Sequence, residues 1–178
     1  MIIAKRLCKI PMLVLICLTA GCAKAPAENS AATNANPTEP PPIKSVDVVK
    51  ASPQEVTLAA GEAGDAVVKL EIKSGYHVNA NPPSFSYLKA TQLEITPAEG
   101  ISVQSMTYPN PLTRKFAFSE KPLAVYEGEA TVKARLKTDK SAKPGTHNLS
   151  AKLSVQACDE AVCYAPGTMD VTVPVNIK

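Results

Sequence analysis

The sequence predicts an all-β fold, and three observations indicate it. From about Ile43 onward, apolar residues alternate with polar ones, which is the period of half-buried strands in antiparallel sheets. Stretches rich in Gly, Pro and Asn separate the alternating segments. The chain has 16 prolines among 178 residues, and proline breaks helix interiors. Short strands at this spacing, without a helical pattern, predict an immunoglobulin-like antiparallel β-sandwich.

Three segments carry the clearest alternation, at residues 129–137, 147–155 and 170–177. Because the chain has no Trp and only 4% aromatic residues, the core must consist mainly of Val, Leu, Ile and Ala. Further strands are predicted around 68–72, 93–95 and 101–103. Pro174 interrupts the last segment, which predicts an edge position or a bulge there, since proline cannot donate to a strand ladder.

The first 21 residues have the three-part plan of an export signal. Basic residues come first, and an apolar run at 10–18 follows, too short to span a bilayer, which takes about 20 residues. Small residues, Thr19-Ala20-Gly21, then precede Cys22. This ending resembles a bacterial lipobox, in which the cysteine is lipidated and becomes the first mature residue. An ordinary cleavable signal with an incidental cysteine is the alternative.

A tether is predicted between the signal and the folded domain. Residues 22–42 contain mainly Ala, Asn, Pro, Thr and Glu, and they end in three prolines. Such a segment buries too little apolar surface to offset the entropy of ordering. We therefore expect a signal peptide at 1–21, a lipid-anchored tether at 22–42 and a folded domain at 43–178. The protein would lie on the periplasmic side of a bacterial membrane, anchored at Cys22.

The formal net charge of +3 gives no support for a nucleic-acid partner. Lys5, Arg6 and Lys9 belong to the predicted signal, which contains no acidic residue. Without them the 19 basic residues fall to 16, equal to the 16 acidic residues. Nucleic-acid binding requires a concentrated basic patch, which this balance does not indicate.

Two cysteines, Cys158 and Cys163, lie in the predicted folded part. Val155 and Ala157 continue the inward-facing set of their strand, so Cys158 should point outward at the end of the strand. Cys163 follows just past a turn. A disulfide between them would close a hairpin-like loop near the surface, without crossing the core.

The chemistry of this pair is open to three interpretations. A structural disulfide is the default after export, although so short a loop constrains the unfolded chain only by roughly 2 kcal/mol. A redox-active pair needs an accessible sulfur, which an outward position provides, while Asp159 and Glu160 should disfavour a thiolate. A metal site would need further ligands, such as His77 or His147, both of which we expect to be ordinary surface histidines.

The residues around the pair resemble a known family. The stretch from Gln156-Ala157-Cys158 to Cys163-Tyr164-Ala165-Pro166 is similar to the active-site stretch of the N-terminal periplasmic domains of DsbD-type thiol:disulfide interchange proteins. Residues 75–81 (Gly-Tyr-His-Val-Asn-Ala-Asn) and 108–111 (Tyr-Pro-Asn-Pro) also resemble this family. The similarity covers about 44–178.

The resemblance implies an immunoglobulin-like fold and a redox-active pair that needs no cofactor. In the family the pair takes electrons from a thioredoxin-like donor and passes them to disulfide-isomerase-like acceptors. Cys163 matches the cysteine that attacks the acceptor, and Cys158 the one that resolves the mixed disulfide. Phe116 or Phe118 falls where the family has a shielding cap loop, although both could simply pack at the sandwich edge.

Full-length family proteins also carry a multi-span membrane domain and a thioredoxin-like domain. This chain has neither before its last residue, Lys178, so we expect its redox partners to act in trans. If the pair is active, the protein is a thiol-disulfide oxidoreductase that relays electrons. The rival interpretation is a non-catalytic binding or scaffold domain with a structural disulfide.

The lipid anchor has a direct test. We expect the intact mass of the membrane-extracted protein to exceed that of residues 22–178 by a diacylglyceryl group, usually with a further acyl chain. An unmodified mass, or a product released as a soluble protein, would exclude the anchor.

Overall fold

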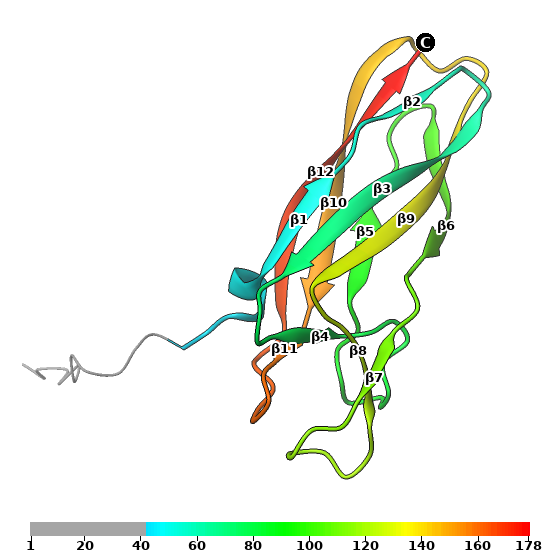
Figure 1. Cartoon of the computed structure of the whole chain (residues 1–178). Coiled ribbons are helices and arrows are strands. Elements are labelled where there is room, and N and C mark those ends of the chain that lie inside the picture. The colour runs from blue at the N-terminus through cyan, green and yellow to red at the C-terminus, as the bar shows by residue number, and fades with distance from the viewer. Residues whose placement is uncertain (1–41) are drawn as a thin grey trace, which may run out of the picture. The chain divides into compact units, whose positions relative to one another are not determined.

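The computed structural model describes residues 42–178. The predicted signal and nearly all of the predicted tether lie outside these residues. Two four-stranded sheets form the body of the domain. A third sheet, of four shorter strands, lies at one end of it (Figure 1). No helix within 42–178 is long and apolar enough to span a membrane.

The strands of the first sheet are, in spatial order, β1 (Val49–Pro53), β3 (Ala63–Ile72), β9 (Glu129–Thr138) and β6 (Ile101–Thr107). Those of the second are β2 (Val56–Leu58), β12 (Gly167–Ile177), β10 (Gly145–Val155) and β5 (Gln92–Ile95). The third sheet contains β11 (Ala157–Cys158), β4 (His77–Asn79), β8 (Leu123–Tyr126) and β7 (Leu112–Arg114). A 3₁₀ helix, η1 (Ser45–Val48), precedes β1.

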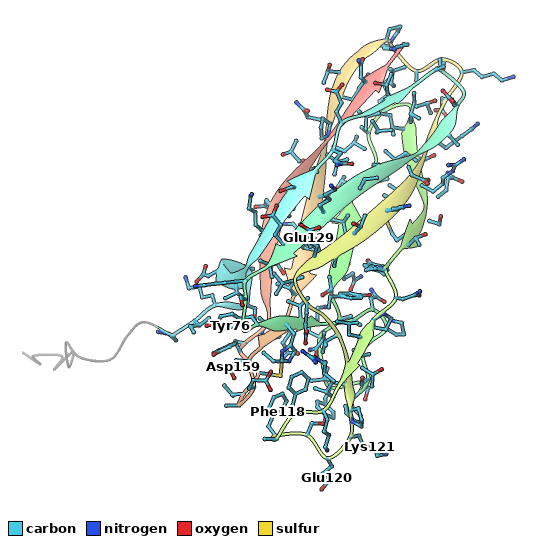
Figure 2. The ribbon with its side chains drawn as sticks, viewed as in Figure 1. Tyr76, Phe118, Glu120, Lys121, Glu129 and Asp159 are labelled. Atoms are coloured by element: carbon cyan, nitrogen blue, oxygen red, sulfur yellow. A yellow bond between two sulfur atoms is a disulfide. The ribbon has the colours of Figure 1, made fainter. Side chains whose placement is uncertain are left out.

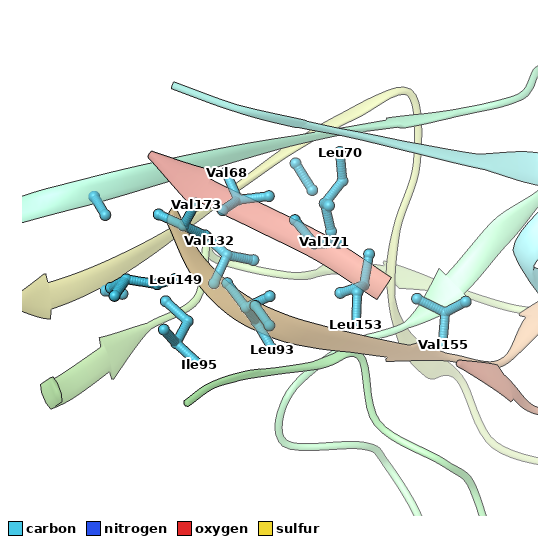
Figure 3. Close-up of a cluster of buried hydrophobic side chains, with 14 of the residues drawn as sticks. Val68, Leu70, Leu93, Ile95, Val132, Leu149, Leu153, Val155, Val171 and Val173 are labelled. Atoms are coloured by element: carbon cyan, nitrogen blue, oxygen red, sulfur yellow. The ribbon is translucent and has the colours of Figure 1, made fainter. Parts of the chain in front are cut away.

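The alternation read from the sequence is confirmed as the core of the sandwich. Every second residue of the long strands is buried, and these side chains meet between the first two sheets (Figure 3). Fully burying a Leu or Val stabilises the fold by about 1.5–3 kcal/mol relative to exposure. The strands β3, β9, β10 and β12 contribute most of this core, including Val68, Leu70, Val132, Leu136, Leu149, Leu153, Val173 and Val175.

Pro174 lies in β12 and pairs with a neighbouring strand on one side only. On one side Pro174 faces Asn148 of β10, with no shift of register along that pair. On the other side the parallel pairing with β2 begins only at Val175. The predicted edge position is therefore confirmed for this part of β12, which from Gly167 to Pro174 pairs with β10 only, whereas the bulge is absent.

The third sheet forms because the chain leaves the second sheet at Gln156. β10 pairs with β12 and β5 up to Val155 and Ser154, respectively. After one intervening residue, Gln156, β11 pairs with β4 instead. This change of partner carries the cysteine segment to the end of the sandwich (Figure 1).

Candidate redox site

Cys158 and Cys163 form a disulfide within a narrow antiparallel pair of segments. The amide of Asp159 donates to the carbonyl of Val162, and the amide of Tyr164 donates to the carbonyl of Ala157. Cys158 and Cys163 therefore face each other between two hydrogen-bonded pairs, with their Cα atoms 3.9 Å apart. The predicted hairpin-like loop is confirmed, and the bond does not cross the core.

The prediction that Cys158 lies at the surface is wrong, because its side chain is 0% exposed. The alternation itself holds: Ala157 joins the main core, whereas Cys158 is not part of that cluster. However, Cys158 pairs with His77 of β4, and Phe116 from the loop between β7 and β8 stacks on that histidine. Cys163 is half-buried, so the two cysteine residues differ in exposure.

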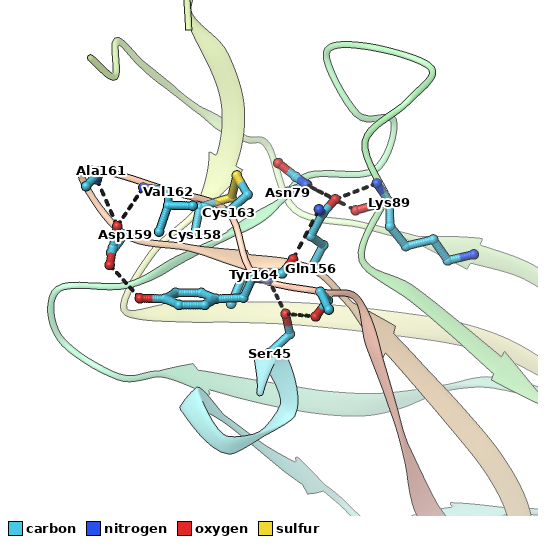
Figure 4. The surroundings of a disulfide bond; sticks show 12 residues. Ser45, Asn79, Lys89, Gln156, Cys158, Asp159, Ala161, Val162, Cys163 and Tyr164 are labelled. Atoms are coloured by element: carbon cyan, nitrogen blue, oxygen red, sulfur yellow. Dashed lines mark hydrogen bonds between the residues drawn. A yellow bond between two sulfur atoms is a disulfide. The ribbon is translucent and has the colours of Figure 1, made fainter. Parts of the chain in front are cut away.

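Asp159 organises the turn between the cysteines. Its Oδ1 atom accepts hydrogen bonds from the amides of Ala161 and Val162, both at 2.8 Å (Figure 4). Its Oδ2 atom accepts one from the Tyr164 hydroxyl at 2.5 Å. The bond from Tyr164, followed by those from the two amides, lowers the pKa of Asp159. The same bond raises the pKa of Tyr164 to about 12.

Ser45 fixes the base of the cysteine loop from the other side. Its hydroxyl donates to the carbonyl of Ala165 at 2.6 Å and accepts from the amide of Ala157 at 2.9 Å (Figure 4). Gln156 adds a second anchor. Its Oε1 atom accepts from the Asn79 side chain at 3.0 Å and from the Lys89 amide at 2.8 Å. The turn is therefore held at its tip and at its base.

His77 lies beside the disulfide, contrary to the prediction of an ordinary surface histidine. It is the β4 residue directly opposite Cys158, and it is only 2% exposed. A turn over Lys73 to Tyr76 leads into this strand, and Gly75 adopts φ +84°, a conformation that other residues rarely adopt. Burial lowers the pKa of His77 from its ordinary value of 6.5, so the ring is neutral at pH 7.

Both candidate cap residues lie on the loop between β7 and β8. Phe116 is buried and stacks on the His77 ring, with the ring centroids 4.0 Å apart. Phe118 stacks on Phe116 at 5.3 Å and is 39% exposed. Figure 2 shows Phe118 at the same end of the domain as Asp159. The Lys115 ammonium group donates to the carbonyls of Ser119 and Glu120 and so closes the loop on itself.

The loop between β7 and β8, residues 115–122, is called the cap loop. It rests on its own small apolar cluster. Phe116, Leu123 and Val125 are buried together, separately from the main core, and Phe85 and Leu88 pack against them. Beside this cluster lies a pocket of about 270 Å³. Its lining includes Cys163, Phe118, Tyr87 and Leu123. Cys163 therefore lies at a surface pocket of mixed polar and apolar lining, which also includes Ser119 and Gln156.

Charged residues also lie close to His77. Arg114 makes a two-pronged salt bridge to Glu127, with N–O distances of 2.8 and 3.0 Å. These two residues and Glu160 line a second pocket together with His77. Acidic groups thus lie close to the imidazole, yet its burial outweighs their effect on the pKa.

The described residues bring together no three His, Cys, Asp or Glu side chains that could hold a metal ion. His147, the other histidine considered as a ligand, lies on β10, where its Nε2 atom is 2.9 Å from the carbonyl oxygen of Lys143.

The family model for the N-terminal domain of the thiol:disulfide interchange protein DsbD matches residues 45–174. The chain belongs to the DsbD N-terminal domain family. The fold is accordingly the immunoglobulin-like sandwich that the sequence predicted. Family membership and the disulfide-bonded pair support a periplasmic thiol:disulfide exchange module that interacts with thioredoxin-like redox partners.

Two solved structures are similar to this family member. The DsbD N-terminal domain of Neisseria meningitidis in the reduced form is 19% identical, with a TM-score of 0.48. That match covers 81% of this chain and 95% of the other. The N-terminal periplasmic domain of ScsB from Proteus mirabilis is 17% identical, with a TM-score of 0.47, and the match covers 72% of this chain and 45% of the other. No curated protein sequence matches the chain.

Sequence reasoning found both cysteines of this DsbD-type domain but missed three supporting residues. Ser45 showed no pattern beyond that of an ordinary polar residue, and Gln156 lay at the start of the family-like stretch without any sign of its hydrogen bonds. Tyr164 lay within the family-like stretch, and an Asp one residue after the first cysteine could have suggested a turn-capping role, because Asp often bonds to amides two or three residues on.

The bond between Tyr164 and Asp159 gives a test at both ends of the pH range. We expect Tyr164→Phe to lower the free energy of unfolding of the oxidised protein at neutral pH. The difference from wild type should shrink as pH falls through the lowered pKa of Asp159, because protonation removes the charged acceptor. It should shrink again as pH rises from the ordinary tyrosine value of 10.0 toward about 12.

Denaturant unfolding at a series of pH values measures this difference. Tyr87→Phe is the matched control, because Tyr87 is 77% exposed and lies outside the turn. A Tyr164→Phe effect that stays constant from pH 2 to pH 12, or that Tyr87→Phe reproduces, would contradict the role of this bond.

Proposed function

We propose that this chain relays reducing equivalents by thiol–disulfide exchange through Cys158 and Cys163. The donor is a thioredoxin-like domain and the acceptors are disulfide-isomerase-like proteins, both acting in trans. A lipid at Cys22 anchors the domain to a membrane facing the periplasm. The observation that carries the proposal is the unequal burial of the two sulfurs, Cys158 fully buried and Cys163 half-buried.

Unequal burial supports a division of labour between the cysteines. Exchange requires attack by a thiolate on an accessible disulfide sulfur through a mixed-disulfide intermediate. Of the two cysteines, only Cys163 lines the pocket beside the cap loop, so Cys163 is the one that a partner's disulfide can approach. Cys158, held directly opposite it, then attacks Cys163 and releases the reduced partner.

The surface beside Cys163 supports docking of a protein partner. Tyr87, Phe118 and Val162 are large, exposed apolar side chains, with exposed fractions of 77%, 39% and 49%. Tyr87 and Phe118 line the pocket with Cys163, and Val162 precedes it in the turn. Aromatic residues at an exposed apolar patch are characteristic of protein interfaces.

In this proposal Phe116 and Phe118 act as the cap. Phe116 holds the loop against His77, while Phe118 is the exposed residue that a docking partner displaces. The short loop, closed by Lys115, joins two strands of the third sheet, so it can move without disturbing the core between the first two sheets. The cap would keep the pair from reacting with small thiols until a partner binds.

Trapping with cysteine variants tests the order of attack. We expect Cys158→Ser to accumulate a mixed disulfide between Cys163 and a partner, because the resolving thiol is absent. Cys163→Ser should accumulate none, since its remaining thiol is buried. Non-reducing electrophoresis with mass spectrometry of periplasmic extracts measures the adducts.

A Cys158→Ser/Cys163→Ser double variant is the control for non-specific adducts. Equal trapping by the two single variants would contradict the assigned order. The absence of any adduct in both variants would favour the structural disulfide.

A further inference from the structure

Three side chains lie in one row across the third sheet: His77, Cys158 and Cys163. β4 pairs with β11 so that His77 is directly opposite Cys158, and the next pair across is Cys158 with Cys163. Directly opposite residues of an antiparallel pair project to the same face, with Cβ atoms about 4.5–5.5 Å apart. The imidazole and the two sulfurs therefore share one face.

The Nε2 atom of His77 is buried and makes no hydrogen bond to any residue in 42–178. A buried polar group without a partner is costly, and such atoms are uncommon in native proteins. Phe116 covers one face of the ring, so the imidazole is held in place rather than free to rotate toward solvent. The fold thus maintains an unpaired ring nitrogen on the residue that pairs with Cys158.

We propose that His77 is the proton acceptor and donor for the Cys158 thiol. This inference rests on the proposed exchange function and adds a residue to it. Cys158 needs such a group because its side chain is fully buried and Asp159 and Glu160 lie beside it, so the free thiolate is disfavoured.

The proton and electron balance is closed within the exchange reaction. Cys163, as a thiolate, attacks a partner disulfide, forming the mixed disulfide and releasing one partner thiolate. The Cys158 thiol then gives its proton to Nε2 of His77 as its sulfur attacks Sγ of Cys163. The Cys158–Cys163 bond forms, the bond to the partner breaks, and the departing partner thiolate takes the proton from the imidazolium. Two electrons and one proton pass from the domain to the partner, and the partner thiolate released first takes any proton it binds from water.

The groups facing His77 set the pH range in which its imidazole can accept the proton of Cys158. Burial lowers the pKa of the imidazole; Glu127, Glu160 and Asp159 act to raise it, and Arg114 acts to lower it. Because burial is the largest effect, the ring is neutral and able to accept a proton above pH 6.5. In that range, resolution assisted by His77 should not depend on pH, whereas resolution limited by free thiolate rises tenfold per pH unit.

The test uses the reduced, purified protein and one equivalent of dithiobis(nitrobenzoate), a disulfide that releases a coloured thiolate. The first release reports attack by Cys163 and depends on concentration. The second reports resolution by Cys158 and is unimolecular. We expect the wild-type second phase to be flat between pH 6.5 and 8. In His77→Gln it should be slower by about a hundredfold at pH 7 and should rise tenfold per pH unit.

His147→Gln is the matched control and should leave both phases unchanged, since His147 lies on β10, away from the row. A wild-type second phase that rises tenfold per pH unit overturns the inference, whether or not the His77 variant folds. A His77→Gln variant that slows both phases equally indicates a structural role and also overturns it. If no second phase occurs at all, the exchange function itself has failed.

Discussion

The candidate site depends on the change of strand partner at Gln156. Up to Val155, β10 belongs to the second sheet; from Ala157 the backbone bonds to β4. This switch keeps Ala157 in the core, while Cys158 lies outside the main core and pairs with His77, on which Phe116 of the cap loop stacks. Gln156 stabilises the switch itself, because its side chain ties the strand to Asn79 and Lys89. Without this change of strand partner, the segment that contains both cysteines would simply continue β10.

Around this switch, the cysteine turn is held by hydrogen bonds, and the cap loop packs apart from the main core. Ser45 and Asp159 hold the cysteine turn through backbone amides and carbonyls that the disulfide does not supply. The turn can therefore keep its shape when the bond is reduced, as a redox carrier requires. The cap loop, in contrast, rests on a cluster separate from the main core. The main core and the proposed reactive site therefore lie in different parts of the fold.

The sequence predicted the sandwich well because a period of two, repeated over long strands, has a single physical meaning: one face is buried. It also identified the cysteine loop, since Val155 and Ala157 set its direction. The sequence did not predict that Cys158 and His77 are buried. The loop between β7 and β8, which packs on His77 through Phe116, is distant from both residues in the sequence. Three-residue strands such as β4 carry too little pattern to show such pairing.

The proposed function requires that the bond between Cys158 and Cys163 be exchangeable in the folded domain. The most direct measurement is a thiol-trapping titration of the purified protein across glutathione or dithiothreitol redox buffers, with the fold followed by circular dichroism. A single two-electron transition above about −300 mV, with the fold intact in both states, is the predicted result. A bond that resists reduction until the domain unfolds would contradict the account and leave a structural disulfide.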